Sequence, residues 1–166
     1  MVASGQLKPL LHCWPENNNS NKPTYGGLYN GYAVKDSRGL CPTGWHVSTE
    51  PEWIALEVEL GLPQTETSTT GIRAVTENVG GKLKATSRWN SPNTGANNSS
   101  GFSAIGTGYR RPAGEFPHFM EWTGYFTSTT SSAGKLWMRY IGYDTGGIQR
   151  EEREVQYGYS IRCVKD

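Results

Sequence analysis

The sequence predicts a strand-dominated α+β fold with two short helices and long loops. Runs of strand-forming residues recur along the second half of the chain, and glycine-containing turns separate them at hairpin spacing. The 166 residues include 21 glycines, 9 tyrosines and 6 tryptophans, a composition that favours many turns and a core built from large rings. Only one stretch carries strong helix signals, so helices are too few for a parallel βαβ sheet.

Length and charge limit the classes of function that the chain can have. A chain of 166 residues is expected to form one domain. Its net charge of +1 provides no field that would draw it to nucleic acid or to an anionic membrane. No run of about eighteen apolar residues is present. We therefore expect no nucleic-acid partner and no membrane span.

The chain divides into an N-terminal arm or linker, residues 1–24, and a folded domain, residues 25–166. The arm contains the polar, low-complexity run Asn17–Asn21. From Tyr25 onward, aromatic residues alternate with small ones, and Leu28–Val34 is expected to form the first strand.

One stretch predicts a turn, a strand and a helix in succession. Pro42 and Gly44 predict a tight turn, and Trp45–Val47 is expected to be extended. Thr49 with Glu52 has the spacing of a capping box, so a helix should begin there. Apolar residues then recur at helical spacing: Trp53, Leu56 and Leu60, with Ile54 and Val58 alongside. Gly61 should end the helix.

The remaining elements are a weaker helix and a series of strands. Ile72, Val75 and Val79 recur at helical spacing, and Gly80 and Gly81 would close this second helix. Ser91–Ser100 is expected to be a surface loop. The predicted strands that follow are Phe102–Ile105, Gly108–Arg110, Glu115–Met120, Tyr125–Ser128, Leu136–Tyr143, Gln149–Arg153 and Tyr157–Val164.

Three cysteines leave two arrangements open. Joining Cys41 to Cys163 would close a loop of about 120 residues, worth roughly 4–5 kcal/mol in the chain-entropy model. The alternative is two buried free thiols in a cytosolic protein. Cys13 is the odd residue, which is either free or paired with a partner chain.

Seven short motifs follow one another along the chain: Tyr25–Asn30, Gly39–Val47, Glu52–Trp53, Gly80–Ala85, Asn98–Ala104, Gly108–Arg110 and Tyr159–Asp166. They occur in the order seen in the Fibrobacter succinogenes major paralogous domain, a family that the chain resembles from about Tyr25 to Asp166. That family is similar in turn to the C-type-lectin-like fold, and particularly to its formylglycine-generating (sulfatase-modifying) branch. The resemblance implies a compact domain with two helices, terminal strands side by side and a variable loop surface, and it supports a Cys41–Cys163 bridge.

Catalysis and metal binding receive little support from the residues. The sulfatase-modifying relatives hold copper with a close cysteine pair, which is absent here. His46 lies between Trp45 and Val47, which favours a packed imidazole over a general base. No Ser, Cys or Asp stands at a telling distance from His118, so we expect no enzyme activity. We expect no cofactor except a possible structural calcium ion, to which oxygen atoms could come from Asn93, Asn97, Asn98 and Asp144.

Binding is better supported, because aromatic and charged residues crowd the C-terminal third. Tyrosine offers flat apolar area and a hydroxyl at little entropic cost, which suits recognition of sugars or protein loops. Trp137 and Arg139 are assigned to the interior, Arg139 as a fork on backbone carbonyls. The predicted ligand-binding residues are Tyr125, Tyr143, Asp144, Gln149, Arg150, Glu152, Arg153 and Tyr157.

We therefore expect a non-catalytic recognition or adhesion module that binds a glycan or a cell-surface protein, outside a bacterial cell or on a phage particle. The first alternative is a structural decoration or tip subunit that docks onto other chains through residues 1–24. The second is a degenerate enzyme of the sulfatase-modifying type.

Overall fold

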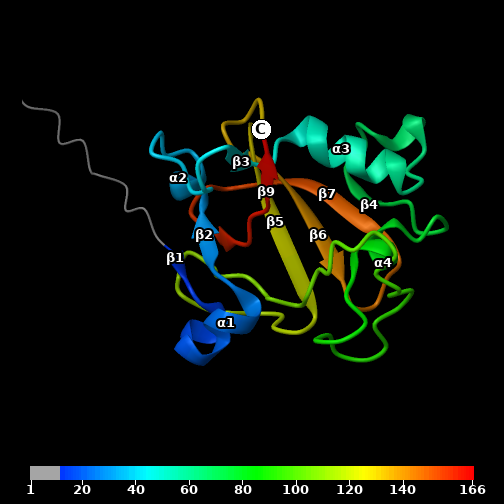
Figure 1. The fold of residues 1–166 in the computed structure, drawn as a ribbon, viewed down its shortest axis with the longest axis horizontal. Coiled ribbons are helices and arrows are strands. Elements are labelled where there is room, and N and C mark those ends of the chain that lie inside the picture. Colours follow the sequence, from blue (N-terminus) through cyan, green and yellow to red (C-terminus); the bar gives the residue numbers. More distant parts are fainter. Residues whose placement is uncertain (1–11) are drawn as a thin grey trace, which may run out of the picture.

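The computed structural model describes residues 12–166, which form a strand-dominated α+β domain with antiparallel sheets (Figure 1). This confirms the predicted class. The described residues contain four short α-helices where the sequence predicted two: α1 (Lys22–Tyr25), α2 (Gly31–Val34), α3 (Glu50–Glu59) and α4 (Val79–Leu83).

A four-stranded antiparallel sheet forms the centre of the domain. Its order is β4 (Gly71–Arg73), β7 (Ile148–Arg153), β6 (Leu136–Gly142) and β5 (Trp122–Thr130). The register sets Arg139 of β6 opposite Tyr125 of β5 and Arg150 of β7. Because paired residues point to the same face of a sheet, these three side chains lie on one face.

Two small sheets join the ends of the chain. β1 (His12–Cys13), β2 (Leu28–Asn30) and β8 (Gly158–Tyr159) form one, and β3 (Trp45–Val47) pairs with β9 (Cys163–Lys165) in the other. Figure 1 shows β2 and β9 on the same side of the central sheet. The early and late strands therefore lie side by side, as the resemblance implied.

The disulfide between Cys41 and Cys163 is present, with Cα atoms 5.8 Å apart and 122 residues between them in sequence. It fixes the loop before β3 to β9. Of the two arrangements that the sequence left open, the bridge is the one that forms. Cys13 is a free, half-buried thiol, whose pKa is raised by burial despite the nearby Arg110.

Helix α3 begins at its predicted cap. The Thr49 hydroxyl accepts a hydrogen bond from the Glu52 amide (3.4 Å), and the Glu52 carboxylate accepts one from the Thr49 amide (2.7 Å). Beyond the helix end, Gly61 has a φ of 107°, a conformation that glycine adopts without strain. The buried face differs from the prediction, because it carries Glu50 and Glu57 beside Trp53.

Two predicted elements are wrong in kind. The strand expected at Leu28–Val34 stops at Asn30, whose side chain accepts a hydrogen bond from Ala33 N (3.0 Å) and so caps α2. The helix expected from Ile72 begins only at Val79. Residues 71–73 instead pair with β7, and the left-handed conformation of Asn78 separates the strand from α4.

The segment between residues 101 and 120 forms only isolated bridges where three strands were expected. At Gly108, an added Cβ would lie 2.7 Å from the Pro117 carbonyl oxygen, so two stretches of backbone cross too closely for a regular ladder. The last predicted strand is likewise divided into β8 and β9 by residues 160–162.

Residues 12–24, assigned to an arm from the sequence, belong to the folded body. β1 pairs with β2, and Pro15 is buried. The rest of the predicted arm, residues 1–11, lies outside the described residues.

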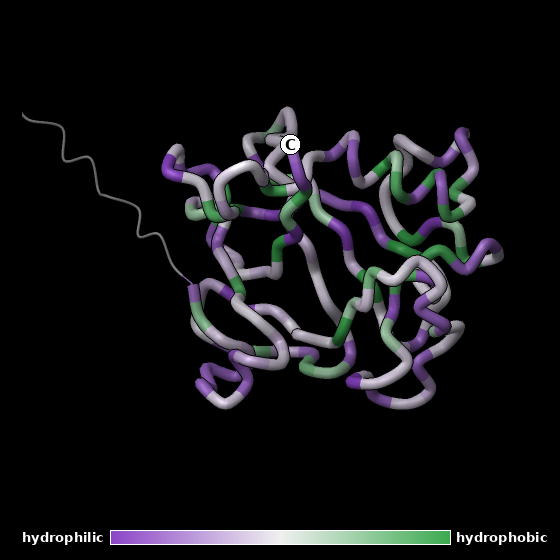
Figure 2. Tube along the Cα trace, viewed as in Figure 1, coloured by the Kyte–Doolittle hydropathy of each residue, from purple (hydrophilic) through white to green (hydrophobic). Residues whose placement is uncertain are grey.

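Each face of the central sheet packs against its own cluster. One cluster contains Trp53, Tyr125 and Ile141 and lies beneath α3, whereas the other contains Phe126, Met138 and Tyr159. Along the Cα trace in Figure 2, hydrophobic residues gather in the interior and hydrophilic residues follow the outer loops.

Candidate functional site

A small open pocket lies on the face of the central sheet that points away from α3. We call it the aromatic pocket. Its volume is about 190 Å³, and its lining comes from β5, β6, β7 and the crossing loop: Tyr109, His118, Trp122, Tyr140, Gln149, Glu151 and Arg153.

Strand alternation decides which residues of β7 reach this pocket. Successive side chains of a strand point to opposite faces. Gln149 and Arg153 therefore share the pocket face with Glu151, while Arg150 and Glu152 point toward α3. Two of the predicted ligand-binding residues, Gln149 and Arg153, are brought together here.

The ring of Tyr109 is the centre of the aromatic part. It stacks on His118 with ring centroids 5.8 Å apart and contacts Tyr140 at 6.0 Å. Trp122 meets Tyr140 edge-on at 6.0 Å. The loop between residues 101 and 120 supplies Tyr109, and the Gly108 amide, which donates to the Trp122 carbonyl oxygen (2.8 Å), joins that loop to β5.

A chain of polar groups runs along the β7 side of the pocket. The Glu151 carboxylate accepts hydrogen bonds from Gln149 Nε2 (3.2 Å) and from Arg153 Nη2. The Arg153 guanidinium lies 5.7 Å from the Tyr140 ring and 5.5 Å from the Tyr157 ring. Its Nε atom is buried without a hydrogen-bond partner among the described residues. The polar chain is thus held in place before any ligand arrives.

Two further groups complete the chemistry of the pocket. His118 Nδ1 lies 3.0 Å from the Glu121 carboxylate, so the imidazole is oriented from outside the pocket. The Tyr140 hydroxyl is hydrogen-bonded to that of Tyr159, and burial raises its pKa. It therefore stays a neutral phenol around neutral pH.

The opposite face of the sheet carries a buried network of ions. Arg139 is fully buried and bonds both Glu57 (Nε–Oε1 2.5 Å) and Glu50 (Nη1–Oε2 2.7 Å). Arg73 bonds the same Glu57 (2.9 Å), and Arg150 bonds the same Glu50 (2.6 Å). We call these five residues the buried ion network. Burial opposes ionisation of Glu50, but its two arginine partners outweigh it and lower the pKa of the carboxyl group.

This network corrects three sequence-based assignments. Arg139 is interior, as predicted, but its partners are mainly carboxylates and not backbone carbonyls. Arg150, predicted at the ligand-facing rim, is 7 % exposed and stacks 3.6 Å from the Trp137 ring. Tyr125, also predicted there, is 3 % exposed within the core beside Trp53.

The other predicted site residues are dispersed. Tyr143 is half-buried against the core under α3, and Asp144 is exposed next to it. Glu152 lies opposite Trp137 on the α3 face. Tyr157 contacts the rings of Tyr109 and Tyr159 and so borders the aromatic pocket.

Five lining residues have no counterpart in the predicted ligand set: Tyr109, His118, Trp122, Tyr140 and Glu151. The sequence assigned Gly108–Arg110 to a short strand and to the resemblance, but not to a ligand site. This motif carries no signal that its loop crosses the sheet.

A buried lysine occupies the region where a calcium ion was considered. The Lys84 ammonium group donates to the carbonyl oxygens of Thr94 (2.7 Å), Gly142 (2.8 Å) and Thr145 (2.9 Å). Burial lowers the pKa of this ammonium group to about 8, although the Asp144 charge opposes the shift. The cation that these carbonyl oxygens surround is therefore the ammonium group of Lys84.

Two of the four side chains proposed for calcium are engaged within their own loop. Asn97 and Asn98 accept hydrogen bonds from Ser99 and Ser103 within their own loop. Between residues 12 and 166, no group of three or more His, Cys, Asp or Glu side chains could hold a metal ion. Cys41 and Cys163 are bonded to each other, so neither supplies a thiolate for copper.

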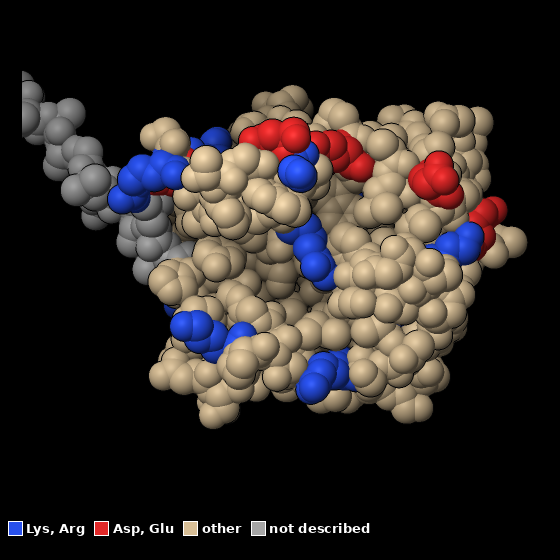
Figure 3. All heavy atoms as spheres, viewed as in Figure 1, with Lys and Arg blue, Asp and Glu red and all other residues tan. Residues whose placement is uncertain are grey.

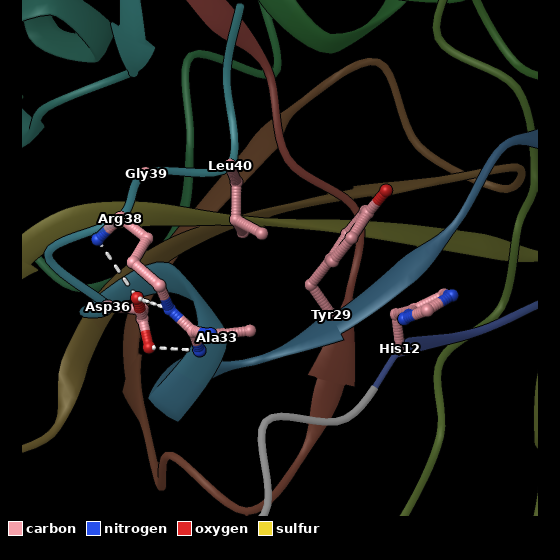
Figure 4. A pocket seen from close by; sticks show the side chains of 7 residues that line it. All are labelled: His12, Tyr29, Ala33, Asp36, Arg38, Gly39 and Leu40. Carbon is pink, nitrogen blue, oxygen red and sulfur yellow. Dashed lines mark hydrogen bonds and ion pairs between the residues drawn. The ribbon is translucent and has the colours of Figure 1, made fainter.

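Another pocket, of about 320 Å³, lies between β2 and the loop after α2 (Figure 4). Figure 4 shows the ion pair of Asp36 with Arg38 at one end and the rings of Tyr29 and His12 at the other. The hydrogen bonds from Arg38 lower the pKa of Asp36 to about 2. We assign no site to this pocket, because His12 in its wall directly follows residues 1–11, which the structure does not describe.

The fold and the aromatic pocket define a disulfide-closed, strand-dominated domain that presents rings and a fixed polar chain at an open surface. The chain belongs to the Fibrobacter succinogenes major domain family, whose model matches residues 5–165. No curated protein and no solved structure matches it. Within residues 12–166, no helix has the length and apolar character needed to cross a bilayer.

Proposed function

We propose that this domain is a non-catalytic recognition module with a C-type-lectin-like fold, which binds a glycan through the aromatic pocket. The observation that carries the proposal is the pairing of aromatic rings with the chain of Gln149, Glu151 and Arg153. Ring faces can pack against the C–H face of a sugar, while amide, carboxylate and guanidinium groups bind its hydroxyls.

The size and openness of the pocket suit one end of a longer ligand. Pockets that enclose a small-molecule ligand usually measure about 300–1,000 Å³. The aromatic pocket is smaller, about 190 Å³, and open, which suits the end of a longer chain. The family name describes no activity, so the assignment is based on this geometry.

The proposed location is extracellular, at a bacterial surface or on a virion. The support is the Cys41–Cys163 bridge, because disulfides persist mainly in oxidising compartments.

Glycan-array binding with a matched pair of variants tests the proposal. Glu151 and Glu152 are neighbours on β7, but only Glu151 lines the pocket. Glu151→Gln should weaken binding to the preferred glycan by about tenfold, the effect of losing one good charged hydrogen bond. Glu152→Gln should leave it unchanged. EDTA should also have no effect on glycan binding, because the carbonyl oxygens in the region considered for calcium already bind the Lys84 ammonium group.

A protein that binds no glycan on a broad array, or two variants that weaken binding equally, would remove the aromatic pocket as the site. If the ligand is a protein, the partner would be captured in a pull-down of labelled surface proteins and then titrated. The proposal holds for this partner if Glu151→Gln weakens its binding and Glu152→Gln does not.

A second candidate is a structural subunit of a larger assembly, and the exposed apolar residues of one sheet edge favour it. Ile72 of β4 and Val75 beyond it are 51 % and 55 % exposed, and β4 is the outer strand of the central sheet. Ile72→Asp should abolish incorporation into the native particle while glycan binding persists. Unchanged incorporation would exclude this edge as the contact.

A further inference from the structure

The extended segment that contains β8, residues 160–162 and β9 has one hydrogen-bonded edge and one edge that is open beyond β8. Even-numbered residues use the paired edge. Gly158 bonds Arg110, Ser160 bonds Gly124 and Phe126, and Arg162 accepts from Ser48 N (2.9 Å). Val164 then lies opposite His46, and Asp166 N donates to Gly44 O (3.0 Å).

Odd-numbered residues point their backbone groups the other way, because backbone direction alternates along a strand. Tyr159 meets Tyr29 of β2 on that side. Ile161, Cys163 and Lys165 follow. Cys163 and Lys165 lie opposite Val47 and Trp45 at the non-hydrogen-bonded positions of the β3–β9 ladder, because Arg162 and Asp166 on either side carry its hydrogen bonds, so their backbone groups point to the open side. An unpaired row of N–H and C=O groups is a template for another strand.

A groove lies along this open edge, and we call it the β9 groove. It measures about 700 Å³, with Ile161 and Cys163 on one side and Gly26 and Gly27 on the other. Phe102 borders it. Figure 3 shows this face hollowed near its centre, with basic atoms beside the hollow and the acidic groups toward the margin of the face.

The charged residues that line the groove are Lys22 and Arg162, with no acidic side chain among the lining residues. Arg162 stacks 4.3 Å from the Phe102 ring and bonds the Phe102 carbonyl oxygen (2.7 Å). At the far end of β9, the carboxylates of Asp166 and Glu52 both contact His46 and raise its pKa. These carboxylates are therefore already engaged.

An apolar pocket of about 540 Å³ continues the groove beyond Cys163. It shares Phe102, Arg162 and Cys163 with the groove, and α3 supplies Trp53 and Leu56 to its wall. An extended chain along the edge would thus meet a basic strip and an apolar wall.

We propose that the β9 groove binds an extended peptide with acidic and apolar residues, which adds as a strand to the open edge of β9. Main-chain hydrogen bonds to Ile161, Cys163 and Lys165 supply affinity, and acidic side chains paired with Arg162 and Lys22 supply selectivity. The peptide site is separate from the aromatic pocket.

Fluorescence anisotropy with a labelled peptide that alternates Val and Glu tests the strand addition, and a Val–Lys peptide is the charge control. Two N-methylated versions, modified on alternate residues, distinguish a strand from a side-chain contact. In strand addition, one version loses at least about tenfold in affinity, because its blocked N–H groups face β9, and the other binds normally. Equal binding by both versions, or no binding of the Val–Glu peptide, would overturn the proposal.

Arg162→Gln should weaken binding of the Val–Glu peptide by about tenfold, whereas Arg111→Gln, an exposed arginine outside the groove, should not. Arg162→Gln should still bind the glycan of the aromatic pocket. The unmodified protein with the N-methylated peptides gives the answer even if Arg162→Gln fails to fold. Stronger binding of Val–Lys than of Val–Glu would refute the charge assignment.

Discussion

The two faces of the central sheet hold their polar groups in opposite ways. Under α3, Arg139 is fully buried and is bonded on both sides by Glu50 and Glu57. On the other face, Glu151 and Arg153 form a comparable ion pair that remains partly exposed at the rim of the aromatic pocket. The same strands thus carry a closed network on one side and an accessible one on the other.

This difference separates the charged residues that hold the fold together from those that remain accessible to a ligand. Buried charges are expensive to leave unpaired, so the ion network fixes the position of α3 on the sheet and cannot exchange its partners for a ligand. Groups at an open pocket keep contact with water and can exchange it for ligand hydroxyls. Burial therefore assigns Arg150 to the fold and leaves Arg153 accessible to the proposed ligand, although the two lie three residues apart.

The largest expected effect is the loss of the bond that closes the aromatic side. Cys41 packs against the cluster of Phe126 and Tyr159, and its bridge spans 122 residues. The paired substitution of Cys41 and Cys163 by Ser should cost about 4–5 kcal/mol of unfolding free energy, measured with urea. Cys13→Ser, a change at the free thiol, is the control. A loss below about 1 kcal/mol would show that packing alone holds β9.

Breaking the buried ion network should be nearly as costly. Glu57→Ala leaves Arg73 without its carboxylate and Arg139 with only one, so we expect a loss of about 3–5 kcal/mol in urea unfolding. Glu59→Ala, on the exposed side of the same helix, should change stability by less than about 0.5 kcal/mol. Similar values for both variants would mean that the network contributes nothing specific.

The network also predicts a dependence on pH. The pKa of Glu50 is lower in the folded protein than its ordinary value of 4.5. Its contribution is therefore complete above pH 4.5 and is lost as the pH falls through the folded pKa. Glu50→Gln should be less stable at pH 7 and should lose less on acidification to pH 3.

Urea unfolding at several pH values measures the difference between the two curves, and Glu59→Gln should follow the unmodified protein. Parallel curves for Glu50→Gln and the unmodified protein would contradict the assignment.

Much of the central sheet was predictable from sequence, because its strands have strong signals. Leu136–Tyr143 and Gln149–Arg153 match β6 and β7 within one residue at each end, and the capping box of Thr49 and Glu52 located α3. Local chemistry determines such elements. The predictions for residues 28–34 and 72–81 were wrong, because an asparagine changes the backbone direction in each. Asn30 caps α2 with its side chain, and Asn78 adopts a left-handed conformation.

The site was only half predictable, for a physical reason. Alternation predicts that Gln149 and Arg153 share a face, but it does not say which face is covered. That depends on α3, whose buried side carries Glu50 and Glu57, and a sequence pattern assigns glutamates to solvent. Tyr109 reaches the pocket through a crossing loop, a contact between distant segments that no local pattern encodes.

The prediction with the smallest expected loss of stability distinguishes the two faces of the central sheet most clearly. The hydroxyls of Tyr140 and Tyr159 bond each other inside the aromatic cluster. Tyr140→Phe leaves the Tyr159 hydroxyl buried without that partner, so we expect a loss of about 1–2 kcal/mol in urea unfolding. The double variant, with Phe at both positions, removes both polar groups and should cost no more than the single change. On the α3 face, by contrast, removing Glu50 in addition to Glu57 should add to the loss, because Arg73, Arg139 and Arg150 are then all left without a carboxylate partner. A double variant that loses the sum of its two single changes would show that the aromatic face is also held by its polar groups.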